Sequence, residues 1–294
     1  MELLPIFLVQ TVRIAIPYLF AAAGGVVAER AGIVSLTLEG FMLTGAFTAV
    51  LGSYYTGSAM IGVLCGVLGG LLFGLLHAVA SIRFRADQIV VGIAINLLAV
   101  GATRFFLQLA FDSSSNSPRV AGLSAADLGI ATGLLSSLVN PLVWLGLVTI
   151  PSVWWLVYRT PFGLRVRAVG EHPEAAASVG VPVARVRYAA VALSGVLAAL
   201  GGVYLALDQH QFTDSMTAGR GFIALAAVIF GRWDPVRAGI ACLLFAAAET
   251  LQIHLQTVQA IPSQLVSTLP YVLTIVALAG VVGRSVPPTA LGKN

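Results

Sequence analysis

Two uncharged segments decide the fold of this chain: PLVWLGLVTIPSVWWLVY at residues 141–158 and YAAVALSGVLAALGGVYLAL at residues 188–207. Each approaches the roughly 20 apolar residues that a helix needs to cross a bilayer. Because lipid offers the backbone no hydrogen-bond partner, both segments are expected to be transmembrane α-helices. The loop between them, 159–187, carries five arginines, which predicts a cytoplasmic location by the positive-inside rule: Arg159, Arg165, Arg167, Arg185 and Arg187.

The composition is that of a membrane protein. Hydrophobic residues make up 58% of the chain and charged residues 10%, against about 25% charged in soluble proteins, and the mean hydropathy is +0.95. The net charge of +4 does not indicate nucleic-acid binding, because the arginines are scattered among apolar spans. Cys65 and Cys242 lie in apolar runs and the four histidines are far apart, so the sequence predicts neither a disulfide framework nor a metal site.

The hydropathy pattern predicts an all-α, polytopic membrane protein in which residues 1–294 form a single transmembrane domain. We expect about nine hydrophobic elements, with boundaries uncertain by a few residues. The element at 221–231 is too short to span a bilayer, so it is expected to be re-entrant or a broken helix against protein or a water-filled cavity. The nine elements are 5–28, 33–52, 58–80, 88–110, 141–158, 188–207, 221–231, 236–254 and 265–283.

The basic residues test the sidedness of these elements. With the 159–187 loop placed inside and the elements alternating outwards, twelve of the sixteen basic residues fall on the cytoplasmic side. This arrangement predicts an extracytoplasmic N-terminus and a cytoplasmic C-terminus. The remaining four lie in spans or outside: Arg13, Arg104, Arg119 and Arg220.

Glycines recur every four residues in the third element, at Gly62, Gly66, Gly70 and Gly74. Such a face lets two helix backbones approach closely in a membrane. Packing within the chain is the favoured interpretation, and a subunit interface is the alternative.

Ionisable and polar residues inside spans are candidates for function. Arg104 and Glu249 are both expected towards the outer ends of their helices, where they could form an ion pair, with snorkelling to the headgroups as the alternative. Asn96 lies in the middle of its element and favours an interhelical hydrogen bond over a substrate contact.

The cytoplasmic loop contains Glu174-Ala175-Ala176 followed by Gly180, a Glu-Ala-Ala-x-x-x-Gly pattern. With this pattern the loop resembles the coupling loop of bacterial ABC importer permeases. The longer string 160–180 is similar to the branch that handles simple sugars and nucleosides, which is related to branched-chain amino acid permeases. His172 stands where that branch often has Asn.

Two further segments carry the same resemblance. Residues 29–43, ERAGIVSLTLEGFML, resemble the signature of the nucleoside-type members, although Ser35 replaces their usual Asn. Residues 230–235, FGRWDP, resemble a short inner loop of the family. The resemblance covers nearly the whole chain, from Ile16 to Gly283.

The resemblance implies a permease subunit of an ATP-driven importer in the bacterial plasma (inner) membrane. The expected cargo is a nucleoside, with a simple sugar as the alternative. The implied partners are membrane lipids, cytoplasmic ATPase subunits, an extracytoplasmic substrate-binding protein and a second permease chain, with a heterodimer favoured over a homodimer. The expected ATPase-coupling residues are Gly170, Glu171, His172, Pro173, Glu174, Ala175, Ala176 and Gly180.

The residues themselves predict that the chain is not an ATPase and needs no cofactor of its own. Its only lysine is Lys293, so a phosphate-binding Gly-x-x-x-x-Gly-Lys loop is excluded. An ion-coupled carrier using Glu39 or Glu249 is a competing hypothesis, and a membrane-embedded enzyme is the least supported. Small or uncharged groups are expected along the translocation path, which suggests Ser35, Thr37, Asn96 and the broken element near Thr217 to Phe222.

Overall fold

The computed structural model describes residues 3–123, 127, 138–257 and 286–293. This part of the chain is helical, and its only β-type pairing is an isolated bridge between Asn116 and Thr213. The helices are α1 (Leu3–Arg30), α2 (Leu38–Thr56), α3 (Ala59–Ala78), the π-helical turn η1 (Val79–Arg83), α4 (Gln88–Phe111), α5 (Pro141–Arg159), α6 (Pro161–Glu171), α7 (Pro173–Ser178), α8 (Val183–Gln209), α9 (Arg220–Phe230) and α10 (Pro235–Thr257).

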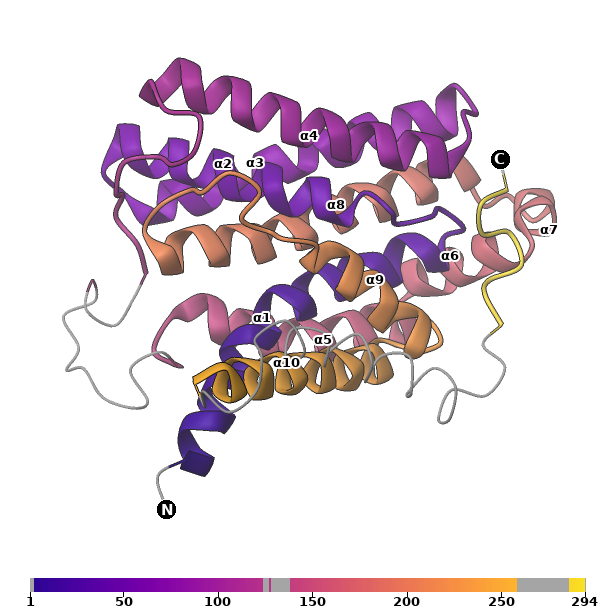
Figure 1. Ribbon diagram of the computed structural model, residues 1–294. Helices are drawn as coiled ribbons and strands as arrows, with labels where there is room; N and C mark the ends of the chain where they lie inside the picture. The colour runs from indigo at the N-terminus through magenta and orange to yellow at the C-terminus, as the bar shows by residue number, and fades with distance from the viewer. Residues whose placement is uncertain (1–2, 124–126, 128–137, 258–285, 294) are drawn as a thin grey trace.

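The long helices form two groups that meet along α1 and α8. Helix α8 packs against α1, α2 and α3, while α1 also packs against α5, α9 and α10. Figure 1 shows α2, α3, α4 and α8 on one side and α1, α5 and α10 on the other, with α9 between them. The core is rich in alanine and valine, and buried glycines such as Gly70 on α3 permit the close backbone approach that membrane helices use.

The membrane-spanning prediction is confirmed in its coarse form. Six of the described helices are long and apolar enough to cross a bilayer. Helix α2 is not among them; it lies between α3, α4 and α8 and buries polar or small residues such as Thr44 and Ser53. The predicted total of about nine elements is not confirmed, because the segment 265–283 lies outside the described residues. The six spans are Leu4–Arg30, Ala59–Arg83, Gln88–Phe111, Pro141–Arg159, Val183–Gln209 and Pro235–Gln256.

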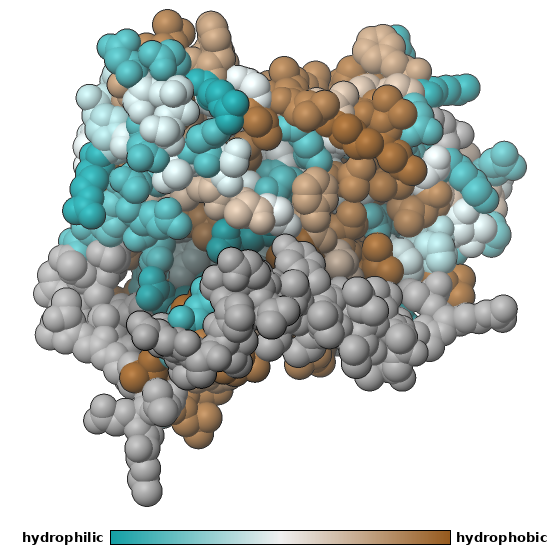
Figure 2. All heavy atoms as spheres, viewed as in Figure 1, coloured by the Kyte–Doolittle hydropathy of each residue, from teal (hydrophilic) through white to brown (hydrophobic). Residues whose placement is uncertain are grey.

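The outer faces of these helices suit a lipid environment. Large hydrophobic side chains are exposed on α3, α4, α5 and α10, among them Leu68, Leu97, Trp155 and Leu244. Figure 2 shows broad hydrophobic areas on the face in view. Hydrophobic side chains at such density on a surface indicate contact with lipid or with another membrane chain.

The glycine face of α3 packs within the chain. A Cβ atom on Gly70 would lie 2.2 Å from Cβ of Ala199 on α8, and one on Gly62 would lie 2.7 Å from the carbonyl oxygen of Ala49 on α2. These distances are shorter than any real contact, so α3 can approach α2 and α8 this closely only with glycine there. The favoured interpretation of this pattern is therefore correct.

Two helices begin after irregular segments rather than at the ends of spans. The element predicted from residue 33 starts as a helix only at Leu38, because residues 33–35 have no regular structure and lead into a turn. The predicted short element is observed as α9, which follows the irregular segment 211–219 and contacts α1, α2 and α10. The interpretation of 221–231 as part of a broken element agrees with this geometry.

Candidate functional site

The first turns of α2 and α9 meet inside the transmembrane region. Asn96 accepts a hydrogen bond from the backbone N–H of Gly40 (2.9 Å) and donates one to the carbonyl oxygen of Leu36 (2.9 Å). Asn96 lies about 12 Å along α4 from Gln88, at about 1.5 Å per residue, so α2 begins well below the surface. Helix α9 has eleven residues, so its first residue, Arg220, lies about 15 Å from the C-terminal end of the helix.

Glu39, in the first turn of α2, caps α9. One of its carboxylate oxygens accepts hydrogen bonds from the hydroxyl of Thr217 (2.6 Å) and the N–H of Gly219 (2.8 Å), and the other accepts one from the N–H of Gly221 (2.7 Å). The first N–H groups of any helix have no partner within the helix, and its N-terminus carries partial positive charge. The carboxylate of Glu39, from another helix, supplies both the hydrogen-bond acceptors and the negative charge that the N-terminus of α9 needs, at a depth where lipid would supply neither.

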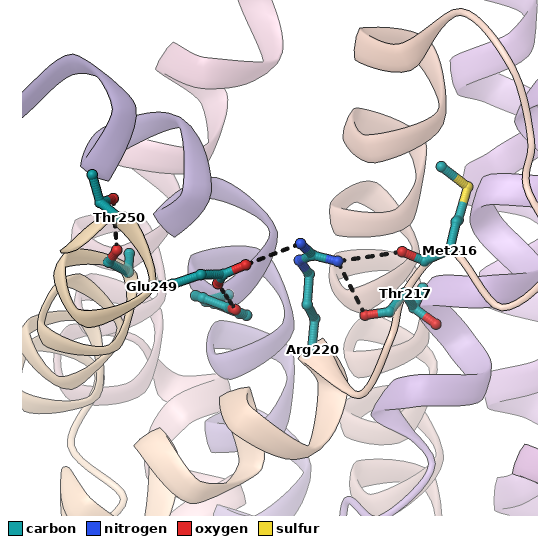
Figure 3. Close-up of polar contacts among 7 residues, drawn as sticks. Met216, Thr217, Arg220, Glu249 and Thr250 are labelled. Atoms are coloured by element: carbon teal, nitrogen blue, oxygen red, sulfur yellow. Dashed lines mark hydrogen bonds and ion pairs between the residues drawn. The ribbon is translucent and has the colours of Figure 1, made fainter. Parts of the chain in front are cut away.

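Arg220 joins this junction to α10. Its guanidinium donates to Glu249 (3.2 Å) and to the carbonyl oxygens of Met216 (3.3 Å) and Thr217 (3.5 Å). Figure 3 shows Arg220 between the α10 carboxylate and these two carbonyl groups. The hydroxyl of Tyr18, on α1, donates to the other oxygen of Glu249. About a quarter of the Arg220 and Glu249 side chains is exposed (23% and 24%), so the pair reaches the surface of the chain.

The predicted ion pair between Arg104 and Glu249 is wrong. Arg104 pairs with Asp214, and Glu249 pairs with Arg220. The sequence argument matched the two residues by depth, but they lie on different sides of the fold. Helix α4 packs on α2, whereas α10 packs on α1, α5 and α9.

Removing one partner of the Arg220–Glu249 pair should cost more stability than removing both, because one charge is then left away from water without its counter-charge. Replacing only Glu249 by Leu leaves the guanidinium without its carboxylate, at a cost of about 2–4 kcal/mol, after allowing for its partial exposure. The double variant Arg220→Met, Glu249→Leu should be more stable than the single variant. Thermal unfolding of the detergent-solubilised protein measures both, and a double variant less stable than Glu249→Leu would contradict this account.

The residues predicted to line the path lie mainly around the start of α2, and most are engaged in structural contacts. Ser35, Thr37 and Thr217 are buried. Ser35 donates through its hydroxyl to the carbonyl oxygen of Gly25 (3.3 Å), and the Asn96 amide is bound at both ends, to the backbone of Leu36 and of Gly40. Phe222 is 45% exposed on α9. Their contact with a transported molecule stays a prediction.

The predicted coupling residues form a compact surface at the C-terminal end of α1 and the N-terminal end of α8. Thr160 caps α6 by accepting a hydrogen bond from the N–H of Gly163 (3.1 Å), and Pro161 occupies the first turn, where its missing N–H does no harm. A second proline, Pro173, starts α7, whose Ala176 is buried while Ala175 and Ala177 are exposed. Gly180 ends this surface with a φ of +86°, a conformation that favours glycine.

Gly170 and Glu171 are the inner part of this surface. A Cβ atom on Gly170 would lie 2.0 Å from the carbonyl oxygen of Arg30, so α6 rests directly on the end of α1. Glu171 accepts hydrogen bonds from the N–H (3.2 Å) and hydroxyl (2.9 Å) of Thr289. His172 and Glu174 are exposed and line, with Glu171 and Arg187, a groove of about 680 Å³.

Sequence reasoning missed three participants in these sites. Gly219 and Gly221 flank Arg220, so no side chain of the usual capping types lies immediately before α9. This absence is the one signal in the sequence that a residue from elsewhere, here Glu39, caps the helix. In the sequence, nothing distinguishes Tyr18 from the other residues of its apolar span. The segment Val286–Lys293 has no pattern that points to the coupling loop.

A protein-family model described as "Branched-chain amino acid transport system / permease component" matches residues 7–278. The chain belongs to this permease family. The permease is 39% identical to the guanosine ABC transporter permease protein NupQ of Bacillus subtilis, over 99% of this chain and 96% of NupQ.

Three other relatives match over most of their length. The nucleoside ABC transporter permease protein NupC of Lactococcus lactis is 36% identical, over 95% of this permease and 92% of NupC. The putative glucose ABC transporter permease protein TsgC13 of Haloferax volcanii is 33% identical, over 94% and 91%. A second Bacillus subtilis guanosine permease protein, NupP, is 22% identical over 87% of this permease and 76% of its own length.

Proposed function

We propose that this chain is the permease subunit of an ATP-driven importer and forms part of the path for a nucleoside. The observation that carries the proposal is the end-to-end similarity to NupQ and NupC, whose names state guanosine and nucleoside transport. A simple sugar is the second candidate, favoured by the similarity to TsgC13. Uptake of radiolabelled guanosine and glucose by cells with and without this gene tests the choice, and loss of glucose uptake alone would reverse it.

ATP hydrolysis is assigned to a separate subunit that docks on α7. The short helix lies on the side that the arginines of the 159–187 loop place in the cytoplasm. Ala175 and Ala177 are exposed there, and small side chains let a helix enter a groove of a partner. Ala176 faces inwards, so it holds α7 in place rather than contacting the ATPase.

Replacing Ala175 by Phe should uncouple ATP hydrolysis from transport. Ala175 is exposed at the edge of the groove beside α7, so the added ring should block docking of α7 without changing the melting temperature. Substrate uptake per ATP hydrolysed, measured with the complete transporter in vesicles, should fall at least about tenfold, equivalent to losing about 1.4 kcal/mol of productive docking. Ala94→Phe, an exposed small-to-large change on α4, is the matched control. Normal coupling in Ala175→Phe would refute this docking site.

The permease is assigned a second, different permease chain as its partner. One copy offers one α7, whereas an ATPase pair needs two docking helices, and Bacillus subtilis has two guanosine permease proteins, NupP and NupQ. The intact detergent-solubilised complex should have a mass that corresponds to two unlike permease chains. A complex with two copies of this chain would show a homodimer instead.

The remaining assignments follow from the same scheme. The chain is placed in the bacterial plasma membrane with its C-terminus in the cytoplasm, and an extracytoplasmic binding protein delivers the substrate. The path is assigned to the surface near the α2–α9 junction, where the Arg220–Glu249 pair is partly exposed.

A further inference from the structure

The segment Val286–Lys293 lies against the coupling loop. Figure 1 shows it as the yellow trace beside α6 and α7. Thr289 donates from its N–H and its hydroxyl to the carboxylate of Glu171. The N–H of Ala290 donates to the carbonyl oxygen of Gly170 (2.9 Å), and Ala290 is buried. The segment therefore holds the C-terminal end of α6, immediately before α7.

The same segment also holds the linker between α1 and α2, residues 31–37. The N–H of Gly292 donates to the carbonyl oxygen of Gly32 (3.2 Å). A Cβ atom on Gly32 would lie 3.1 Å from the carbonyl oxygen of Ala290, and the φ of +86° at Gly32 independently favours glycine. Two residues apart in sequence, Ala290 and Gly292 thus connect α6 to this linker.

The linker leads directly to the α2–α9 junction. The N–H of Ser35 donates to Glu29 (3.1 Å), and the same carboxylate accepts from the indole N–H of Trp233, just after α9. Further on, the carbonyl oxygen of Leu36 is bound by Asn96. Glu39 follows within one turn and caps α9. A displacement of the linker would therefore act on both helices that meet inside the membrane.

We propose that Val286–Lys293 is a positioning element of the ATPase-coupling surface, which fastens α6 and α7 to the α1–α2 linker. Movement of α7 by a bound ATPase then pulls on the linker and reaches the α2–α9 junction. The inference rests on the proposed function, because it assumes that α7 receives the ATPase. The segment also forms one side of the groove beside α7, with Thr289, Ala290 and Lys293 among its lining residues, so the same partner contacts it directly.

The test removes the link at Glu171 and Thr289 from each side. The variants Glu171→Ala, Thr289→Val and their combination are assembled into the complete transporter in vesicles, and guanosine uptake and ATP hydrolysis are measured together. Each single variant should lower uptake per ATP by about threefold to tenfold, the effect of losing a hydrogen bond to a charged group at an exposed site, where water weakens it. The combination should be no worse than Glu171→Ala alone, because that variant already removes both hydrogen bonds from Thr289, whereas Thr289→Val removes only the one from the hydroxyl.

A control and a second measurement separate this proposal from simple packing. Val90→Ala changes an exposed residue of α4, outside the segment and the coupling loop, and should leave uptake per ATP unchanged. All variants should keep the wild-type melting temperature within about 2 °C, because single surface contacts shift stability little. Lower stability with unchanged uptake per ATP would show that the segment only packs, and additive effects in the double variant would show that the two residues act separately; either result overturns the proposal.

The outcome also distinguishes this inference from the proposed function. If Ala175→Phe uncouples transport and the Glu171 and Thr289 variants do not, the positioning role fails and docking on α7 stands. If none of the variants changes coupling, both assignments fail.

Discussion

Replacing Glu39 by Ala should nearly abolish transport and destabilise the protein. The change leaves the hydroxyl of Thr217 and the N–H groups of Gly219 and Gly221 without their acceptor. Each buried donor left without a partner costs about 1–3 kcal/mol, and partial access of water to the junction lowers the sum for the three donors to about 2–5 kcal/mol. Glu39→Gln should be intermediate, because its one carbonyl oxygen retains part of the cap.

Asp87→Ala is the matched control for Glu39→Ala. Asp87 caps α4 by accepting hydrogen bonds from the N–H groups of Ile89 (2.9 Å) and Val90 (3.0 Å), but it lies at an exposed helix end. Water replaces the lost acceptor there, so a cost of about 1 kcal/mol is expected. Thermal unfolding and substrate uptake measure both variants. Equal losses in the two would mean that the α2–α9 junction is no more demanding than a surface cap.

Replacing Gly202 by Ala should also destabilise the fold strongly. The added Cβ would lie 1.8 Å from the carbonyl oxygen of Met42, a backbone atom that cannot move without shifting α2. Overpacking of this kind costs about 1–3 kcal/mol or more, and α8 would be pushed away from α2. Because α2 carries Glu39, the transport rate should fall with the melting temperature.

Gly101→Ala provides the comparison within another transmembrane helix. No atom lies within 4 Å of a Cβ built on Gly101, which is exposed on α4. The same substitution there should be neutral or stabilise by about 0.5–1 kcal/mol, through the lower backbone entropy of alanine. If Gly202→Ala and Gly101→Ala have the same melting temperature in detergent, the close α2–α8 contact does not contribute as the geometry indicates.

The sequence alone determined the features that follow from local composition. Long uncharged runs such as 188–207 have one solution in lipid, a hydrogen-bonded helix, and the helices agree with those predictions within a few residues in most cases. The small-residue face of α3 was likewise readable, because a four-residue spacing defines one side of a helix. The resemblance of the loop at 160–180 pointed to the permease family that the comparison then showed.

Tertiary structure decided which charged and polar groups meet. Depth along a helix can be counted from sequence, but the side of the bundle cannot, and for that reason the Arg104–Glu249 pair was wrong while both residues do have partners. The cap on α9 comes from Glu39, far away in the chain, and the contact between Thr289 and Glu171 joins residues with no shared motif. Such contacts depend on how α2, α4, α9 and α10 are packed, and local patterns carry no information about that packing.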